Sequence, residues 1–176
     1  TILGNIKKDI SNESNSAFIE AAELISKANR VFIVGFRTFS GFASSFGVML
    51  SCIRPGVLVI GNHQPLVDCL IDLNDEDVMI AISFQRYSSD TTFAVEMARD
   101  AKCKVIAITD SYIAPIGQGA ETIIVNSIEN LSFFNFYTSF VMNMEIIIAL
   151  VSKRNKELNE SRLMKMEGYL ERTGQY

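Results

Sequence analysis

Short apolar runs alternate along the chain with longer stretches in which apolar residues recur at helical spacing. Five runs rich in β-branched residues are apolar almost throughout, at residues 31–35, 57–60, 78–82, 104–108 and 122–125. Uninterrupted apolar runs are typical of parallel strands that helices cover on both faces. The alternation therefore predicts a doubly wound α/β fold, a three-layer αβα sandwich around a five-stranded parallel sheet.

The stretches between these runs have the apolar spacing of amphipathic helices. They cover residues 13–28, 43–53, 65–71 and 91–101, and the stretch 133–152 is long and apolar nearly all round. The tail from Lys156 to Tyr176 predicts a C-terminal helix with an incomplete apolar stripe, formed by Leu158, Leu163, Met166, Tyr169 and Leu170. Because its polar face is not predominantly basic, such a helix is more typical of docking on its own or a neighbouring subunit than on a membrane.

A chain of 176 residues is long enough for one compact domain and too short for two ordinary ones. We expect residues 1–12 to be a helical linker from an upstream domain, residues 13–153 to form the domain, and residues 154–176 to form the helical tail. Because the chain begins with Thr1 and shows no signal-peptide pattern, we also expect it to be an excerpt from a longer protein or a processed form.

Composition and charge narrow the function classes. Sixteen Lys and Arg against 20 Asp and Glu give a net charge of −4, which disfavours direct binding of nucleic acid. No apolar segment is long enough to span a bilayer, so we expect a soluble protein. The three cysteines form no CxxC motif, and as small buried residues they fit a reducing cytoplasm.

Motifs for metals and nucleotide cofactors are missing from the sequence. The one histidine, His63, excludes a His-rich metal site and disfavours a Ser–His–Asp triad, and we interpret it as a loop residue. The Walker A pattern is absent, and Gly35, Gly41 and Gly47 do not form GxGxxG. We therefore expect neither a metal nor a cofactor.

Two predicted strand-to-helix turns combine arginine with hydroxyl groups, at the carboxyl ends of strands where open parallel sheets bind ligands. After the first run the chain reads GFRTFSG, with Arg37, Thr38 and Ser40 at the start of a helix. A helix N-terminus and a guanidinium group both attract an anion. The alternative interpretation is that Ser40 only caps the helix and Arg37 is solvated.

The turn after the third run, ISFQRYSSDT, supplies one guanidinium and five hydroxyl groups, from Ser83, Arg86, Tyr87, Ser88, Ser89 and Thr91. One residue is enough to cap a helix, so capping does not account for the cluster. Arginine binds phosphate in a bidentate manner, and hydroxyl groups bond to the remaining oxygens. The two turns together therefore favour an oxyanion ligand.

Two carboxylates follow the later strands. After the fourth run, Asp110 either accepts hydrogen bonds from sugar hydroxyls or holds the turn as an Asx residue. After the fifth run, the loop NSIENLS supplies Asn126, Ser127 and Glu129. Glu129 is the only carboxylate of this loop that could serve as a general base, although ordinary solvation is the favoured interpretation.

The motifs GFRTFS, ISFQRYSSDT and KVIAITDS resemble those of a known family. They are similar to a SIS (sugar isomerase) domain, and more narrowly to the C-terminal effector domain of RpiR/MurR-type bacterial transcriptional regulators. The resemblance runs from about residue 12 to residue 152. It implies a flavodoxin-like αβα sandwich that binds phosphorylated sugars, and a DNA-binding helix-turn-helix domain that lies upstream and is absent from this chain.

The first family motif, G-x-G-x-S, is matched in part. Gly35 matches, Arg37 occupies the position of the second glycine as in the regulator branch, and Phe39 stands where the serine is expected. Thr38 and Ser40 flank this position, and either could replace the missing hydroxyl group.

In the second family motif, S-x-S-G-x-T, Ser83 matches and Ser88 replaces the threonine, while Gln85 and Arg86 replace serine and glycine. The resemblance implies that Ser83 and Ser88 bind phosphate and that Arg86 adds a cation. The predicted ligand-binding residues are Arg37, Thr38, Ser40, Ser83, Gln85, Arg86 and Ser88, with Ser89, Asp110 and Glu129 as further candidates.

We predict a phosphosugar-binding effector and oligomerisation domain of an RpiR-type regulator, without catalytic residues. Its ligand is a phosphorylated sugar or amino sugar, and the regulator reaches DNA only through the upstream domain. The Phe-rich segment 131–137 and the tail stripe carry more apolar surface than one domain needs. This excess predicts a homo-oligomer, either a dimer or a tetramer.

Two other functions are compatible with the sequence. A phosphosugar isomerase of the SIS family needs a carboxylate near the carbon proton and a donor at the ring oxygen. The chain offers one loop histidine and one candidate glutamate for these roles, which disfavours this function. The third hypothesis is a structural dimerisation module that has lost its ligand.

Overall fold

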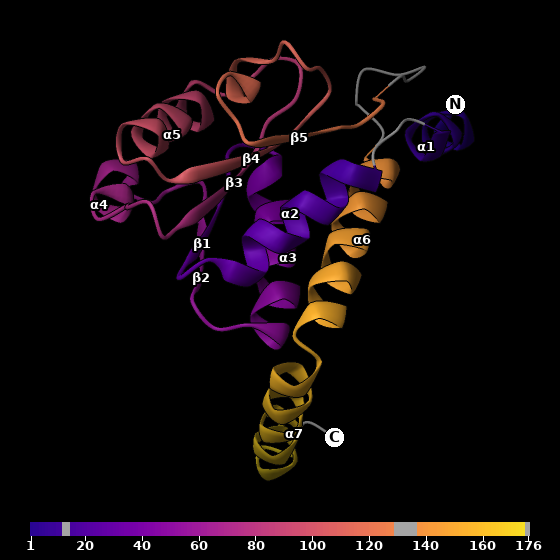
Figure 1. The fold of residues 1–176 in the computed structure, drawn as a ribbon, viewed down its shortest axis with the longest axis vertical. Coiled ribbons are helices and arrows are strands. Elements are labelled where there is room, and N and C mark those ends of the chain that lie inside the picture. The colour runs from indigo at the N-terminus through magenta and orange to yellow at the C-terminus, as the bar shows by residue number, and fades with distance from the viewer. Residues whose placement is uncertain (12–14, 129–136, 175–176) are drawn as a thin grey trace.

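The computed structural model describes residues 1–11, 15–128 and 137–174 of the chain. Within them, five strands form one sheet in the order β2-β1-β3-β4-β5, and all neighbours pair in parallel. The strands are β1 (Val31–Gly35), β2 (Val57–Ile60), β3 (Val78–Ile82), β4 (Lys104–Thr109) and β5 (Thr122–Val125). The predicted α/β fold is confirmed, and each strand coincides with its apolar run to within one residue (Figure 1).

The order of the strands reverses between β1 and β3. The chain runs outward from β1 to β2, then returns across the sheet to β3 and continues to β4 and β5. In the register, Gly35 pairs with Ile82 and Ile82 with Ile108, so the carboxyl ends of the three central strands lie level. The loops after β1 and β3 are therefore neighbours, at the point where open α/β sheets bind ligands.

Helices cover both faces of the sheet (Figure 1). One layer contains α2, α3 and α6, and the other contains α4, α5 and the 3-10 turn η1. Helix α1 packs against α6, and α7 continues beyond the end of α6, away from the sheet. The bounds are α1 (Ile2–Ser11), α2 (Asn15–Lys27), α3 (Phe39–Ile53), α4 (Leu66–Leu70), α5 (Ser89–Asp100), η1 (Pro115–Gly117), α6 (Thr138–Arg154) and α7 (Lys156–Arg172).

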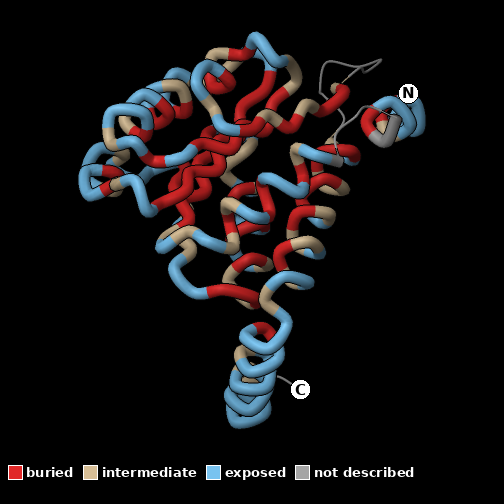
Figure 2. Tube along the Cα trace, viewed as in Figure 1, coloured by how far each residue is buried: buried red, intermediate tan, exposed pale blue. Residues whose placement is uncertain are grey.

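Strand side chains alternate between two cores. In β1, Val31 and Ile33 belong to the core beneath α2, α3 and α6, while Phe32 and Val34 belong to the core beneath α4 and α5. All four residues are buried, as is most of the central sheet (Figure 2). Burial on both faces explains why the strands appear in the sequence as uninterrupted apolar runs. No helix in the described ranges is long and apolar enough to cross a membrane.

Two helices begin four residues or more from where the periodicity predicts. Helix α3 starts at Phe39 rather than at residue 43, directly after a turn in which Phe39 N donates to the Phe36 carbonyl oxygen at 3.1 Å. Serine and glycine in its first turn hide this start from an apolar pattern. Helix α6 starts at Thr138, and residues 133–136 of its predicted range lie outside the described residues.

A buried arginine joins the end of α3 to the end of α2. Arg54 is 5% exposed, and its guanidinium donates to the carbonyl oxygens of Ala28 (2.9 Å), Asn29 (3.1 Å) and Ile25. Carbonyl groups at a helix C-terminus lack helical partners, so Arg54 caps α2 from another element. Burial lowers the pKa of the guanidinium because it removes hydration from the charged form.

Candidate functional site

The loop after β1 turns sharply into α3. Gly35 ends β1, and a Cβ atom there would lie 2.8 Å from the carbonyl oxygen of Phe39, so the close approach requires glycine. Two residues later, Arg37 has a φ of 58°, in the left-handed region that costs a residue with a side chain about 1 kcal/mol. Arg37 and Thr38 are both exposed beyond the carboxyl end of β1.

Asn62, in the loop after β2, holds this backbone conformation. Its Oδ1 accepts a hydrogen bond from Arg37 N (2.7 Å), and its Nδ2 donates to the Arg37 carbonyl oxygen (3.2 Å). Its backbone N donates to Ser40 Oγ (3.2 Å). Ser40 lies inside the first turn of α3, where Thr38 is the N-cap residue. The alternative interpretation of Ser40 as a helix cap is therefore wrong, because its hydroxyl ties α3 to the β2 loop instead.

Asn62 is a residue of the site that the sequence does not predict. The available signal is its place directly after a strand in the loop GNHQP, since Asn side chains commonly bond to the backbone of turns. The bonded partner lies 25 residues away, which a local motif does not show. His63 of the same loop is exposed and has a φ of 68°, in agreement with its interpretation as a loop residue.

The loop after β3 brings Ser83 and Ser88 together at the start of α5. Ser83 is 2% exposed, and its Oγ accepts a hydrogen bond from Ser88 N (3.1 Å). Ser88 is the N-cap residue of α5, yet its hydroxyl makes no capping hydrogen bond. Thr91, in the first turn, is fully buried, and its Oγ1 has no hydrogen-bond partner in the described part of the chain. Capping therefore does not explain these hydroxyl groups, as the sequence predicts.

Arg86 has the same backbone conformation as Arg37 and lies on the neighbouring loop. Its φ is 70°, and the residue is exposed. Backbone strain of this kind costs on the order of 1–3 kcal/mol and tends to occur at functional sites. Two arginines in left-handed conformation concentrate positive charge at one edge of the sheet, next to the N-terminal ends of α3 and α5.

Asp110 connects the loop after β4 to the loop after β3. Its Oδ1 accepts hydrogen bonds from Gln85 N (3.1 Å) and Thr109 Oγ1 (3.3 Å). Burial and the nearby Asp110 carboxylate raise the pKa of Tyr87. Asp110 thus holds the loop after β3 in place, a role that the sequence does not predict, and both expected roles, contact with sugar hydroxyls and an Asx turn, stay predictions. Glu129 lies outside the described residues.

Phe39, at the motif position where serine is expected, packs into an aromatic cluster. Its ring stacks on Phe84, with centroids 4.8 Å and planes 13° apart. It meets Tyr137 and Phe140 edge-on, at 5.3 Å and 5.8 Å. Stacked and edge-to-face contacts stabilise such clusters beyond the area they bury. Phe39 therefore supplies packing between three elements in place of a hydroxyl group.

These groups together can bind a small anion. Thr38 and Arg37 come from one loop, Ser88, Ser89 and Arg86 from the next, and Asp110 lies beside them. In addition, Ser40 Oγ and Ser83 Oγ each accept a hydrogen bond that holds a loop in place. Within the described ranges, no group of three or more His, Cys, Asp and Glu could hold a metal ion.

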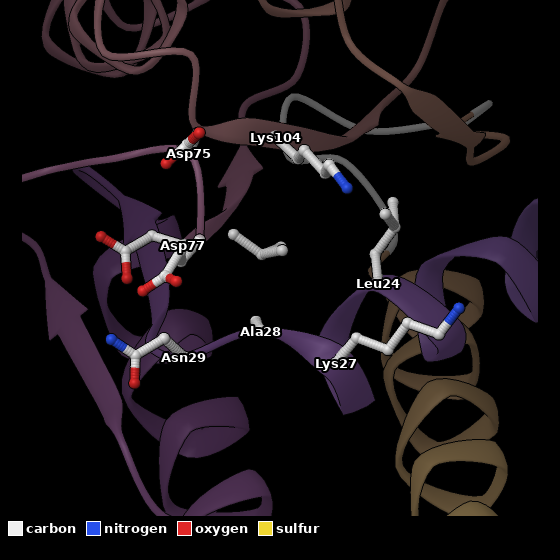
Figure 3. Close-up of a pocket in the computed structure, with 9 residues that line it drawn as sticks. Leu24, Lys27, Ala28, Asn29, Asp75, Asp77 and Lys104 are labelled. Atoms are coloured by element: carbon white, nitrogen blue, oxygen red, sulfur yellow. The ribbon is translucent and has the colours of Figure 1, made fainter.

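The described residues also line two hollows. A cavity of about 390 Å³ opens at the amino edge of the sheet, with Asp75 and Asp77 on one side and Lys27 and Lys104 on the other (Figure 3). Asp77 is fully buried and already paired with Arg30, at 2.6 Å. None of the predicted ligand-binding residues lines this cavity. An apolar hollow of about 410 Å³ separates α3 from α6 and has Thr38 on its rim; its apolar lining is Phe42, Met49, Val141 and Met144.

Sequence comparison finds one family and one curated relative. The model of the SIS domain family matches residues 24–153. An uncharacterized HTH-type transcriptional regulator of Haemophilus influenzae is 26% identical over 107 residues, which cover 61% of this chain and 37% of that protein. The chain thus matches little more than a third of the length of this relative.

Solved structures with the same fold include a domain of a transcription factor and a protein with an inferred isomerase function. The sugar isomerase domain of an RpiR transcription factor from Sphaerobacter thermophilus has a TM-score of 0.89 at 22% identity, over 94% of this chain and 93% of that one. The Vibrio vulnificus NanR protein complexed with ManNAc-6P has a TM-score of 0.82 at 11% identity, over 96% and 65%. A Methanococcus jannaschii protein with an inferred 3-hexulose-6-phosphate isomerase function has a TM-score of 0.73 at 20% identity, over 93% of each chain. At these identities the similarity establishes the fold alone.

Proposed function

The chain belongs to the SIS domain family, and from this membership we propose that it is the phosphosugar-binding effector domain of an RpiR-type transcriptional regulator. Its ligand is a phosphorylated sugar or amino sugar, and DNA binding resides in an upstream helix-turn-helix domain. The relatives support this proposal. One is an RpiR transcription factor, one is an HTH-type transcriptional regulator, and NanR was solved with ManNAc-6P.

One observation carries the proposal: Arg37 and Arg86 lie on neighbouring loops at the strand-order reversal, both with positive φ. A phosphate group offers enough oxygens for both guanidinium groups and for the N-terminal amides of α5. Charge-assisted hydrogen bonds are about twice as strong as neutral ones, which favours a phosphorylated ligand over a neutral sugar. In this proposal Ser83, Ser88 and Arg86 bind the phosphate.

The remaining predicted residues complete the proposed site. Arg37 and Thr38 approach the phosphate from the loop after β1, and Ser40 and Asn62 keep that loop in place. Gln85, Ser89, Asp110 and Glu129 are the candidates for contact with the sugar. Ligand binding shifts the population of subunit arrangements, and so changes the spacing of the attached DNA-binding domains.

We also propose that the chain assembles as a dimer or tetramer. Helix α7 extends from the body, and its Leu163, Met164 and Tyr169 are 42%, 71% and 55% exposed. The apolar hollow between α3 and α6 adds a second uncovered surface. Apolar surface of this extent marks subunit interfaces. The Phe-rich segment 131–137, expected to contribute, lies outside the described residues except for Tyr137.

A thermal-shift screen against sugar phosphates, their parent sugars and inorganic phosphate tests the proposed ligand class. We expect a sugar phosphate to raise the melting temperature by several degrees, and its parent sugar to leave it unchanged. Arg86→Ala and Ser88→Ala should reduce the shift. Arg99→Ala, at the far end of α5, is the matched control and should retain it. No shift with any sugar phosphate, in any variant, would favour the structural dimerisation module.

A phosphosugar isomerase is the second candidate, and the isomerase-like structure of the same fold favours it. Incubation of the chain with the same sugar phosphates, followed by NMR, detects conversion between aldose and ketose. We expect no conversion. Turnover that disappears in Glu129→Gln would overturn the effector proposal, because it would assign a general base to this site.

A further inference from the structure

We propose that Asp9 docks α1 on the ligand-binding edge of the sheet, so that the position of α1 and the binding of ligand are coupled. The Asp9 latch is the pair of hydrogen bonds from Ser127 N to the Asp9 carboxylate. The proposal rests on the proposed function, since it requires a ligand at this edge. It adds a route by which ligand occupancy of the site changes the position of the segment N-terminal to the sheet.

The Asp9 latch joins residues that are 118 positions apart. Asp9, in the last turn of α1, is 4% exposed, and its Oδ1 and Oδ2 accept from Ser127 N at 2.9 Å and 3.2 Å. Ser127 follows the carboxyl end of β5 by two residues and is itself buried. Helix α1 lies beside the start of α6, at the end of the molecule opposite α7 (Figure 1). The latch therefore acts at the edge where the predicted ligand residues lie.

Two opposing costs set the strength of the latch. Docking satisfies the Ser127 N–H, but it removes the Asp9 carboxylate from water. Undocking rehydrates Asp9 and leaves the Ser127 N–H to find another partner. Each position of α1 thus relieves one cost and incurs the other, so the two positions differ in free energy by less than the larger of the two costs. A ligand with modest differential affinity is sufficient to shift such an equilibrium.

Hydrogen bonds connect the latch to the predicted site. Asn126 N donates to the Thr109 carbonyl oxygen (2.7 Å), which extends the pairing of β4 and β5 by one residue. Asp110 directly follows Thr109, the last residue of β4. Its carboxylate accepts a hydrogen bond from Gln85 N in the loop after β3. A ligand that displaces Asp110 or the loop after β3 therefore acts on the segment that carries Ser127. Ser139 Oγ, in the first turn of α6, also donates to the Ser127 carbonyl oxygen (3.2 Å).

The same segment contains a polar side chain that has no hydrogen-bond partner among the described residues in the docked arrangement. Asn126 is 1% exposed, and among the residues that the structure describes neither its Oδ1 nor its Nδ2 has a hydrogen-bond partner. Burying an amide without partners is costly, and native structures contain few such groups. An arrangement of residues 126–127 that pairs this amide would compete with the latch. This competition gives the segment two states that ligand can bias.

Hydrogen exchange of α1 amides in the complete chain tests the latch. The variants are Asp9→Ala, which removes both acceptors, and Asp9→Asn, which retains one. Without ligand, we expect Asp9→Ala to accelerate exchange of α1 about tenfold, Asp9→Asn to have an intermediate effect, and α6 to be unchanged. An α1 that already exchanges as an unfolded peptide in the wild-type chain, or that is indifferent to Asp9→Ala, would show the latch to be wrong.

The coupling is tested by adding the sugar phosphate that gives the largest thermal shift. We expect this ligand to change α1 exchange in the wild-type chain but not in Asp9→Ala. Linkage is reciprocal, so Asp9→Ala should also change the Kd of the sugar phosphate by about threefold or more. Glu20→Gln, which alters an exposed acid of α2, is the control and should change neither quantity.

The outcomes separate the coupling from the proposed function. In one outcome, the wild-type chain binds a sugar phosphate, the ligand does not change the hydrogen exchange of α1, and Asp9→Ala does not change the Kd. The coupling is then wrong and the effector function stands. If no sugar phosphate binds the wild-type chain, the proposed function fails and the coupling fails with it.

Discussion

Asn62 is the residue through which the predicted ligand loop after β1 depends on the loop after β2. Asn62→Ala removes the two side-chain hydrogen bonds that hold Arg37 at positive φ. Because the residue is exposed, we predict a loss of only about 1 kcal/mol in unfolding free energy. We predict a loss of about tenfold in affinity for a sugar phosphate, since Arg37 is no longer presented in one conformation. Chemical denaturation and calorimetry measure the two effects.

A matched control for Asn62 lies two residues away in the same loop. Gln64 Oε1 accepts a hydrogen bond from Gly61 N (2.7 Å), which lies within its own loop. Gln64→Ala should cost similar stability and leave the affinity unchanged. An equal loss of affinity in both variants would contradict the positioning role of Asn62.

Cys103 makes the free energy of unfolding depend on pH in the alkaline range. Burial, together with the nearby carboxylates of Asp77 and Glu121, raises the pKa of its thiol from 9.0 to about 12. Because the folded state resists ionisation, the stability that this thiol contributes is complete below pH 9 and is lost as the pH rises from about 9 towards 12. We predict that wild type loses about 1 kcal/mol more than Cys103→Ala between pH 8 and pH 10 in urea unfolding. Identical pH dependence in both chains would refute this.

At the residue scale, composition and order predict which groups gather at the edge but not the bonds they make. Arg86 and Ser88 could be placed because they lie in the short loop between β3 and α5. The bond between Ser40 and Asn62 could not, since it joins the first turn of α3 to the loop after β2, 22 residues away in the sequence. Nor does a sequence show that Arg37 adopts the left-handed conformation usually left to glycine.

At the scale of elements, Arg54 determines how α2 ends. Arg54→Ala leaves the carbonyl oxygens of Ile25, Ala28 and Asn29 without their guanidinium partner, and the bond to Ile25 is buried. We predict a decrease of about 3 kcal/mol in unfolding free energy, measured by chemical denaturation. Arg99→Ala is the control, because Arg99 is exposed and makes one long contact of 3.5 Å to Gln118; its cost should stay below about 0.5 kcal/mol. Equal costs would mean that Arg54 does not cap α2.

The elements themselves were predictable to different degrees. Strands buried on both faces leave uninterrupted β-branched runs, so their positions follow from the sequence. The start of α3 was missed because Ser40 and Gly41 interrupt its apolar pattern. The docking of α1 was not predictable at all, since it depends on a bond between Asp9 and Ser127 and not on any local pattern.

At the scale of the whole molecule, the uncovered face of α7 predicts the assembly. Light scattering at micromolar concentration should give at least twice the chain mass of 19.6 kDa. Leu163→Glu combined with Tyr169→Glu should shift the chain to monomer, because it places charge in the exposed apolar stripe. Lys165→Glu, on the same helix outside the stripe, should leave the mass unchanged. A monomeric wild-type chain would contradict the proposed oligomer.

The most direct test of the effector function is a calorimetric titration with a sugar phosphate and with its unphosphorylated parent sugar. The proposed site predicts a Kd of about 1–100 µM for the sugar phosphate and affinity at least about a hundredfold weaker for the parent sugar. NMR of the recovered ligand should show the sugar phosphate unchanged. Equal affinity for the two ligands, or conversion of the sugar phosphate into its isomer during the titration, would contradict the account.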